Sequence, residues 1–148
     1  MTVGETITIR LLGPDDLEVL CCQPEGLFDG PVDRAEAAAF LADPHSEMVM
    51  AVAGDLGLSF ASGTVLRHPD KAPSMFVNEV GTREGWQRQG LATRVSVALI
   101  DLARARGCEG IWLGTEPGNT AALALYRRLG GEERRIVGFA WDGAFDED

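Results

Sequence analysis

The sequence predicts an α+β fold, with a mixed, mostly antiparallel sheet flanked by four helices. Residues 46–54 and 58–67 are rich in apolar and β-branched side chains and are separated by a short turn, which is typical of an antiparallel hairpin. Residues 74–82 and 110–115 are also strand-like, and residues 90–106 between them have apolar side chains at helical spacing. Because a helix joins these two strands, we expect them to run parallel.

The part of the chain before the hairpin is expected to form one strand and two helices. Residues 6–12 alternate in polarity and predict a strand, which Gly13 and Pro14 end. Residues 14–22 predict a short helix. Residues 34–41 are rich in alanine and predict a second helix, which Asp33 caps.

The C-terminal part predicts one more helix and a last strand. Residues 119–129 form the expected helix, which Asn119 caps and two glycines end. Residues 132–141, with the sequence EERRIVGFAW, predict the strand. The chain has 148 residues, 45% of them hydrophobic, and shows neither a repeat nor a linker, so we expect a single domain over residues 1–148.

The charge of the chain is strongly negative: 23 acidic against 13 basic residues give a formal net charge of -10. Such a charge argues against nucleic acid as a partner and is compatible with a cationic substrate, or with solubility alone. Acidic side chains gather in two segments, with Glu25, Asp29, Asp33 and Glu36 in the first and Asp142, Asp146, Glu147 and Asp148 in the second.

The sequence contains no apolar run long enough to span a bilayer, and its start lacks the pattern of a secretory signal. We therefore expect a cytoplasmic protein without a membrane partner. The three cysteines and two histidines do not have the spacing of a metal site, so we expect no metal.

The segment QRQGLA, residues 87–92, stands where a predicted strand leads into a predicted helix. The start of a helix leaves backbone N–H groups without partners, and together with the helix dipole they attract anions. Gly90 would let the backbone approach a ligand without a Cβ, and Ala92 keeps the next site small. The segment predicts a pyrophosphate-binding loop, and an ordinary turn is the alternative.

A second motif, NTAALALYRRLGG, begins at Asn119. Tyr126 follows seven residues later, two helical turns on and on nearly the same face. Taken alone, these two residues also fit a helix cap and a core tyrosine.

Together the two motifs resemble the GNAT superfamily of acyl-CoA-dependent N-acetyltransferases, over nearly the whole chain. The family pattern of Gln or Arg, two variable residues, Gly, one variable residue, then Gly or Ala is matched by Gln87, Gly90 and Ala92. The segments RLLGPDD, ALYRRLG and VGFAWD are similar to the aminoglycoside 3-N-acetyltransferases within it. The resemblance implies a GNAT fold, with the parallel strands splayed around acetyl-CoA.

The resemblance also implies the roles of individual residues. Backbone groups of Val80 and Thr82 would form hydrogen bonds with the pantetheine arm of coenzyme A. Asn119 would form a hydrogen bond with the pantetheine or with the phosphate side of the cofactor. Tyr126 would stand beside the thioester sulfur, as the general acid for the leaving thiolate. The residues implied to hold the pyrophosphate are Gln87, Arg88, Gln89, Gly90, Leu91, Ala92 and Thr93.

Acetyl transfer to an amine also needs a base, because an alkyl ammonium has a pKa of roughly 10.4. Glu79 is the candidate, since a carboxylate inside an apolar strand is unusual. An exposed or salt-bridged Glu79 is the alternative. An N–H near Val80 would stabilise the oxyanion.

We therefore expect an acetyl-CoA-dependent N-acetyltransferase that acts by direct attack in a ternary complex. The expected acceptor is a primary amine of a small cationic substrate, such as an aminoglycoside-type antibiotic, which would make the protein an antibiotic-resistance enzyme. The alternatives are a polyamine, a metabolite amine or a protein N-terminus as acceptor, or a non-catalytic coenzyme A-binding sensor. The chain ends where many relatives have a further strand beside the acceptor, so we expect a homodimer.

Overall fold

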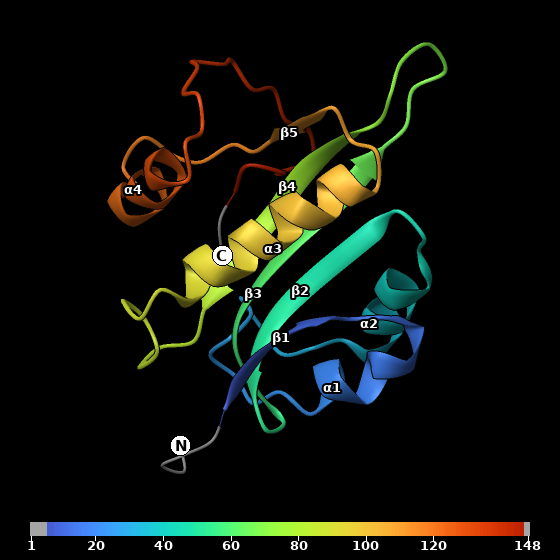
Figure 1. The fold of residues 1–148 in the computed structure, drawn as a ribbon, viewed down its shortest axis with the longest axis vertical. Coiled ribbons are helices and arrows are strands. Elements are labelled where there is room, and N and C mark those ends of the chain that lie inside the picture. The colour runs from blue at the N-terminus through green and yellow to red at the C-terminus, as the bar shows by residue number, and fades with distance from the viewer. Residues whose placement is uncertain (1–5, 147–148) are drawn as a thin grey trace.

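Five strands form one mixed sheet in the order β1-β2-β3-β4-β5 in the computed structural model, which describes residues 6–146 (Figure 1). The strands are β1 (Ile7–Leu11), β2 (Ser46–Ala53), β3 (Leu56–Leu66), β4 (Ser74–Thr82) and β5 (Gly110–Trp112). Strands β1 to β4 pair antiparallel with their neighbours, whereas β4 and β5 pair parallel. The predicted mixed sheet with a parallel last pair is confirmed.

Four α-helices surround the sheet, as predicted: α1 (Leu17–Cys21), α2 (Arg34–Ala42), α3 (Leu91–Ala105) and α4 (Thr120–Arg128). The expected helix over residues 14–22 is split, because a 3-10 turn, η1 (Pro14–Asp16), precedes α1. Helix α3 lies across one face of the sheet, and α1 and α2 lie on the other (Figure 1).

Each face of the sheet has its own apolar core. On the α3 face, Val95, Leu99 and Ala103 are spaced along one side of the helix and pack against the sheet. On the other face, Leu20 and Leu41 of the two short helices pack against the strands. Side chains alternate across the strands, so one sheet separates the two cores.

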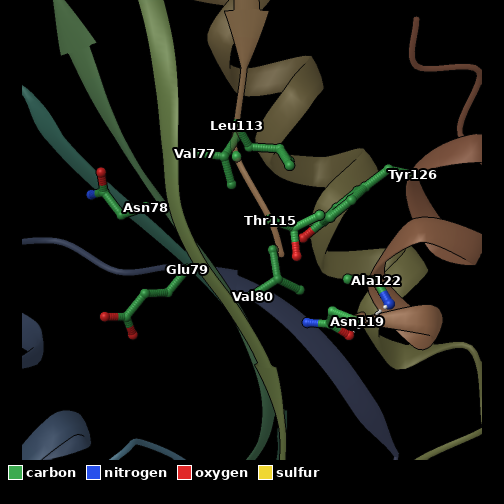
Figure 2. A pocket seen from close by; sticks show the side chains of 10 residues that line it. Val77, Asn78, Glu79, Val80, Leu113, Thr115, Asn119, Ala122 and Tyr126 are labelled. Carbon is green, nitrogen blue, oxygen red and sulfur yellow. Dashed lines mark hydrogen bonds between the residues drawn. The ribbon is translucent and has the colours of Figure 1, made fainter. Parts of the chain in front are cut away.

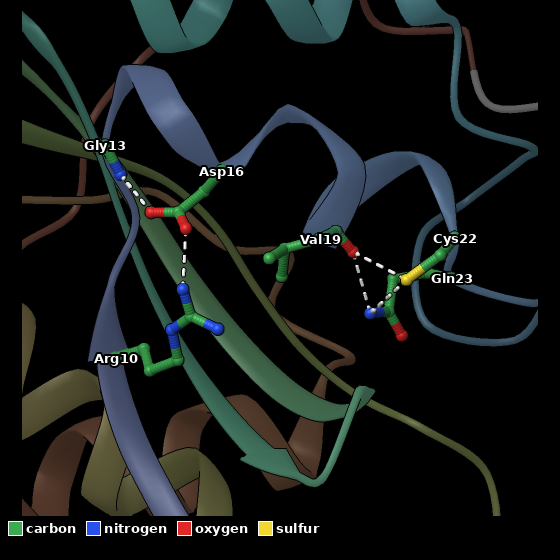
Figure 3. A network of polar contacts seen from close by, with 6 residues as sticks. All are labelled: Arg10, Gly13, Asp16, Val19, Cys22 and Gln23. Atoms are coloured by element: carbon green, nitrogen blue, oxygen red, sulfur yellow. Dashed lines mark hydrogen bonds and ion pairs between the residues drawn. The ribbon is translucent and has the colours of Figure 1, made fainter.

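The turn from β1 into the first helices is held by Asp16 (Figure 3). Its Oδ2 accepts a hydrogen bond from the Gly13 amide at 2.8 Å, and its Oδ1 accepts one from Arg10 Nη2 at 2.6 Å. The carboxylate therefore caps the chain reversal that sends α1 onto its face of the sheet.

The predicted last strand over residues 132–141 is wrong. The structure describes these residues without regular structure, and no strand of residues 6–146 pairs with them. A strand needs a neighbour for its ladder of hydrogen bonds, so a strand-like composition alone does not form one. Glu147 and Asp148 lie outside the described residues. No described helix has both the length and the apolar character needed to cross a membrane.

Candidate active site

Strands β4 and β5 are paired over a short length only, where residues Ser74 to Phe76 face Gly110 to Trp112. Beyond this point the two strands part, and a pocket of about 170 Å³ lies between them (Figure 2). The pocket is lined by Val77, Asn78, Glu79, Val80, Leu113, Gly114, Thr115, Asn119, Ala122 and Tyr126. The predicted splay is therefore present, and it brings together four predicted site residues from two motifs.

A β-bulge in β4 sets which side chains face this pocket. The register between β3 and β4 shifts so that Asn78 has no residue opposite it. The extra residue interrupts the alternation of the strand. As a result Val77 and Val80 point to one side, and Asn78 and Glu79 both point to the other (Figure 2).

Tyr126 stands on α4 and extends toward Thr115 across the gap (Figure 2). The side chain is half-buried, and its removal from water raises the pKa of Tyr126 above the ordinary value. The phenol therefore remains protonated at neutral pH and can donate a proton into the pocket. The interpretation of Tyr126 as a core residue does not fit this position.

Asn119 is the N-cap of α4, as predicted. Its Oδ1 accepts a hydrogen bond from the Ala122 amide at 3.2 Å. Because the cap uses the oxygen, the side-chain Nδ2 is left as a donor at the rim of the pocket (Figure 2). The capping role and a binding role are therefore compatible in this residue.

Glu79 leaves β4 on the face opposite to Val80 and also lines a second, more open groove of about 390 Å³. Phe28 and Phe40 contribute aromatic surface to this groove. Its carboxylates are Asp29, Asp33, Glu36 and Glu79. Three of the four acidic residues of the first predicted segment thus converge with Glu79.

Two effects raise the pKa of Glu79 above its ordinary value. The larger is partial removal from water by the surrounding protein, and the second is the negative charge of Asp29. Glu79 is exposed to solvent, as one of the two alternatives expected, and none of the ion pairs among residues 6–146 involves it. A carboxylate with a raised pKa beside a groove is typical of a general base.

A buried arginine that the sequence analysis missed fixes one wall of this groove. Arg83 is 8% exposed, and its Nε donates to the Gly57 carbonyl at 2.8 Å. Its Nη1 donates to the carbonyls of Pro24 and Glu25 at 3.2 and 2.9 Å. The loop that carries Asp29 is therefore pinned to the end of β4.

Gln23 completes this anchor from within the loop. Its Nε2 donates to the carbonyls of Val19 and Asp55, both at 2.8 Å (Figure 3 shows the first). Its Oε1 accepts from the Gly57 amide at 2.7 Å and from Arg83 at 3.3 Å. Since all these polar groups are satisfied, the network holds the loop in one place.

The loop between β4 and α3 has a backbone that favours anions. Gly85, Arg88 and Gly90 have φ angles of 89°, 64° and 77°, all in the left-handed region. Successive N–H groups in such turns form a concave site for anions. Gly90 is also the N-cap of α3 and makes no side-chain cap bond, so the first amides of the helix have no side-chain acceptor.

The backbone conformation at Gly90 gives a reason for glycine in addition to the predicted close approach of a ligand. A Cβ at this position would meet no atom within 4 Å, so crowding within the chain does not require glycine. The left-handed backbone does, because other residues rarely adopt it.

The other predicted cofactor residues fall into two groups. Gln87, Arg88 and Gln89 are exposed in the loop. Leu91 is buried, so only its backbone can meet a ligand, and Ala92 and Thr93 are half-buried in the first turn of α3.

Thr82 has its side chain within the sheet, where its Oγ1 lies 2.9 Å from Ser59 Oγ. Sequence reasoning did not find Leu113 and Thr115, which line the pocket from the β5 side. Their place directly after a strand parallel to β4 is the signal that could have found them.

Comparisons with known proteins agree with this geometry. The model of the acetyltransferase (GNAT) family matches residues 17–131. The aminoglycoside N(6')-acetyltransferase type 1 of Serratia marcescens is 29% identical over 110 residues, which are 70% of this chain and 75% of that protein. The mycothiol acetyltransferase of Saccharopolyspora erythraea is 39% identical over 62 residues, which are 42% of this chain but only 20% of that protein.

Among solved structures, an aminoglycoside N-acetyltransferase in complex with CoA has a TM-score of 0.76. The two are 21% identical, and the alignment covers 96% of this chain and 99% of that one. The similarity to aminoglycoside acetyltransferases is confirmed, although the curated relative is named for the 6' position rather than the 3 position. The match of the family model over most of the sequence shows that the chain belongs to the acetyltransferase (GNAT) family.

Proposed function

We propose that the whole chain is a single catalytic domain that transfers an acetyl group from acetyl-CoA to a primary amine of a small cationic substrate. The observation that carries the proposal is the junction at Glu79. The gap between β4 and β5, lined by Asn119 and Tyr126, meets an acidic groove at this one residue. The amine would attack directly while both substrates are bound.

Residues of this chain fit coenzyme A at three places. The amides of residues 88–93, at the uncapped start of α3, would hold the pyrophosphate. The backbone of Val80 and Thr82 would pair with the pantetheine where β5 has left β4, and Asn119 Nδ2 would donate to it. When bound, the cofactor supplies the acetyl group as a thioester.

Two side chains would move protons. Glu79 would accept the proton of the incoming ammonium, directly or through a water molecule, and its raised pKa suits this task. Tyr126 Oη would donate a proton to the sulfur that leaves. An N–H near Val80 would stabilise the negative oxygen that forms during attack.

The groove supports a cationic acceptor with more than one ammonium group. Four carboxylates and two aromatic rings are among the groups that line it, and each carboxylate can pair with a positive charge. In its full form the proposal is a cytoplasmic homodimer that modifies an aminoglycoside-type antibiotic, without nucleic acid, membrane or metal as a partner. A polyamine, a metabolite amine or a protein N-terminus is the alternative acceptor.

Release of free thiol from acetyl-CoA tests the proposal against a panel of aminoglycosides, polyamines and peptides with free N-termini. We expect release with at least one polycationic small amine. If thiol is released only with the peptides, the acceptor would be a protein N-terminus and not a small cationic amine. If acetyl-CoA binds but no free thiol is released in the presence of any of these amines, the non-catalytic sensor would be favoured.

A further inference from the structure

Trp86 stands out in the loop that joins β4 to α3 (Figure 1). It is half-buried and packs against the apolar core on the α3 face of the sheet. The other residues from Glu84 to Gly90 are exposed. Trp86 is therefore the one residue of this stretch whose side chain ties the loop to the α3 face.

The segment Gln87–Gly90, which follows Trp86, has little else to hold it. None of the hydrogen bonds and ion pairs made by side chains within residues 6–146 involves a side chain of this segment. Arg88 nevertheless has a φ angle of 64°, a left-handed conformation that is unfavourable for residues other than glycine. Such a conformation persists only where the surrounding structure holds it.

Trp86 and Leu91 fix the two ends of this segment in the same core. Leu91, the first residue of α3, is 2% exposed and belongs to the core cluster against which Trp86 packs. The Trp86 amide also donates to the Arg83 carbonyl at 3.0 Å, and the Arg83 amide donates to the Leu58 carbonyl at 2.8 Å. The start of the loop is thus tied back to β3, and the segment is held at both ends.

We propose that Trp86 is a positioning residue for coenzyme A: its packed ring holds Gln87–Gly90 in the arrangement whose amides bind the pyrophosphate. The proposal rests on the proposed function, because it assigns a role within the proposed cofactor site. Trp86 does not line the pocket between β4 and β5, so it acts through the backbone of the loop. A loop that is already ordered spares the ligand the cost of ordering it.

Calorimetry with coenzyme A compares Trp86→Ala with the wild type. The Kd should rise about 10-fold or more, as it does when a tenth of the molecules or fewer keep the binding arrangement. Trp86→Phe should restore most of the affinity, because a ring still fills the site.

Leu102→Ala is the matched control, since Leu102 is a half-buried residue that packs against the same core at the other end of α3. It should lose stability in urea unfolding but keep the affinity for coenzyme A. An equal loss of affinity in Leu102→Ala would overturn the proposal, because general loosening of the core would then explain the effect.

Two acetyl donors separate an effect on the loop from damage to the whole site. Trp86→Ala should raise the KM of acetyl-CoA about 10-fold with little change in kcat. The KM of S-acetylpantetheine, which lacks the pyrophosphate, should stay near its wild-type value. An equal rise in KM for both donors would overturn the positioning role.

Limited digestion with trypsin follows the loop without any ligand, because Arg88 is exposed within the segment. Cleavage after Arg88, detected by mass spectrometry, should be faster in Trp86→Ala than in the wild type or in Leu102→Ala. If circular dichroism shows that Trp86→Ala is unfolded, Trp86→Met replaces it in each experiment, with changes in the same direction.

The outcomes for this proposal and for the proposed function can be told apart. Wild-type affinity for coenzyme A in a folded Trp86→Ala or Trp86→Met variant would overturn the role of Trp86 and leave the proposed function intact. A wild-type protein that does not bind coenzyme A would overturn both.

Discussion

Glu79 and Tyr126 line the same pocket, but strand β4 stands between their side chains (Figure 2). The carboxylate reaches the acidic groove, and the phenol faces the gap toward β5. The two proposed proton transfers are therefore separated in space, and substitutions can test them one at a time.

Tyr126→Phe should lower kcat by about 100-fold, since general acid catalysis contributes roughly 10²–10⁴. The ring remains, so the affinity for acetyl-CoA in calorimetry should change little. Steady-state kinetics with saturating acetyl-CoA measures the effect. Wild-type turnover in this variant would remove Tyr126 as the acid.

Glu79→Gln should lower kcat/KM for the acceptor by about 100-fold and change its pH profile. A general base acts in its ionised form, so wild-type activity should fall as the pH falls through the pKa of Glu79. Because this pKa is raised, the fall should lie above the pH at which an ordinary glutamate titrates. The Gln variant should lack this fall in activity at low pH. An identical pH profile in both proteins would contradict the assignment of Glu79 as the general base.

Asp29→Asn should shift this fall in activity on the acidic side of the pH profile to lower pH. The charge of Asp29 helps to raise the pKa of Glu79, so its removal makes Glu79 easier to ionise. Glu36→Gln is the control, because Glu36 lines the groove without contributing to this shift. If both variants shift this fall in activity equally, the coupling between Asp29 and Glu79 is not specific.

Gly90→Val should abolish coenzyme A binding while the domain stays folded. The left-handed backbone at φ 77° costs a branched residue about 1–2 kcal/mol and would rearrange the loop amides. Gly107→Val is the matched control at the other end of α3, with φ 85° and open space around it. We expect calorimetry to show an equal loss of stability in the two variants and a loss of binding in Gly90→Val alone. Retained binding in Gly90→Val would rule out this loop as the pyrophosphate site.

Arg83→Met should destabilise the protein by about 2–4 kcal/mol, because buried carbonyls lose their donor. It should also raise the KM of the acceptor more than that of acetyl-CoA, because Asp29 stands on the released loop. Urea unfolding and initial rates measure the two effects. Arg94→Met, an exposed change on α3, should stay within about 0.5 kcal/mol of wild type.

Local signals in the sequence were sufficient for several features. β4 spans Ser74–Thr82 as predicted, and Asn119 caps α4, because an alternating strand and a capping side chain depend on neighbouring residues. The bulge at Asn78 could not be predicted, since it depends on the register with β3. The role of Arg83 depends on carbonyl groups about 26 and 58 positions away, which no local pattern reveals.

The last strand was predicted from the same kind of pattern and was wrong. Residues 132–141 contain β-branched and aromatic side chains, but a strand also requires a neighbour, and composition does not provide one. The candidate site shows the same limit. The motifs identified Glu79 and Tyr126, whereas the convergence of Asp29, Asp33 and Glu36 on Glu79 follows only from the packing of α2 against the sheet.

The two separate cores have a consequence for the evolution and redesign of specificity. Residues that shape the acidic groove pack with α1 and α2, and those that support the proposed coenzyme A-binding loop pack with α3. Substitutions beyond about 7–10 Å with no shared partner usually act independently. The groove could thus be rebuilt for a new amine, by library selection on α2 and its preceding loop, while the acetyl donor is still recognised by an unchanged opposite half of the molecule.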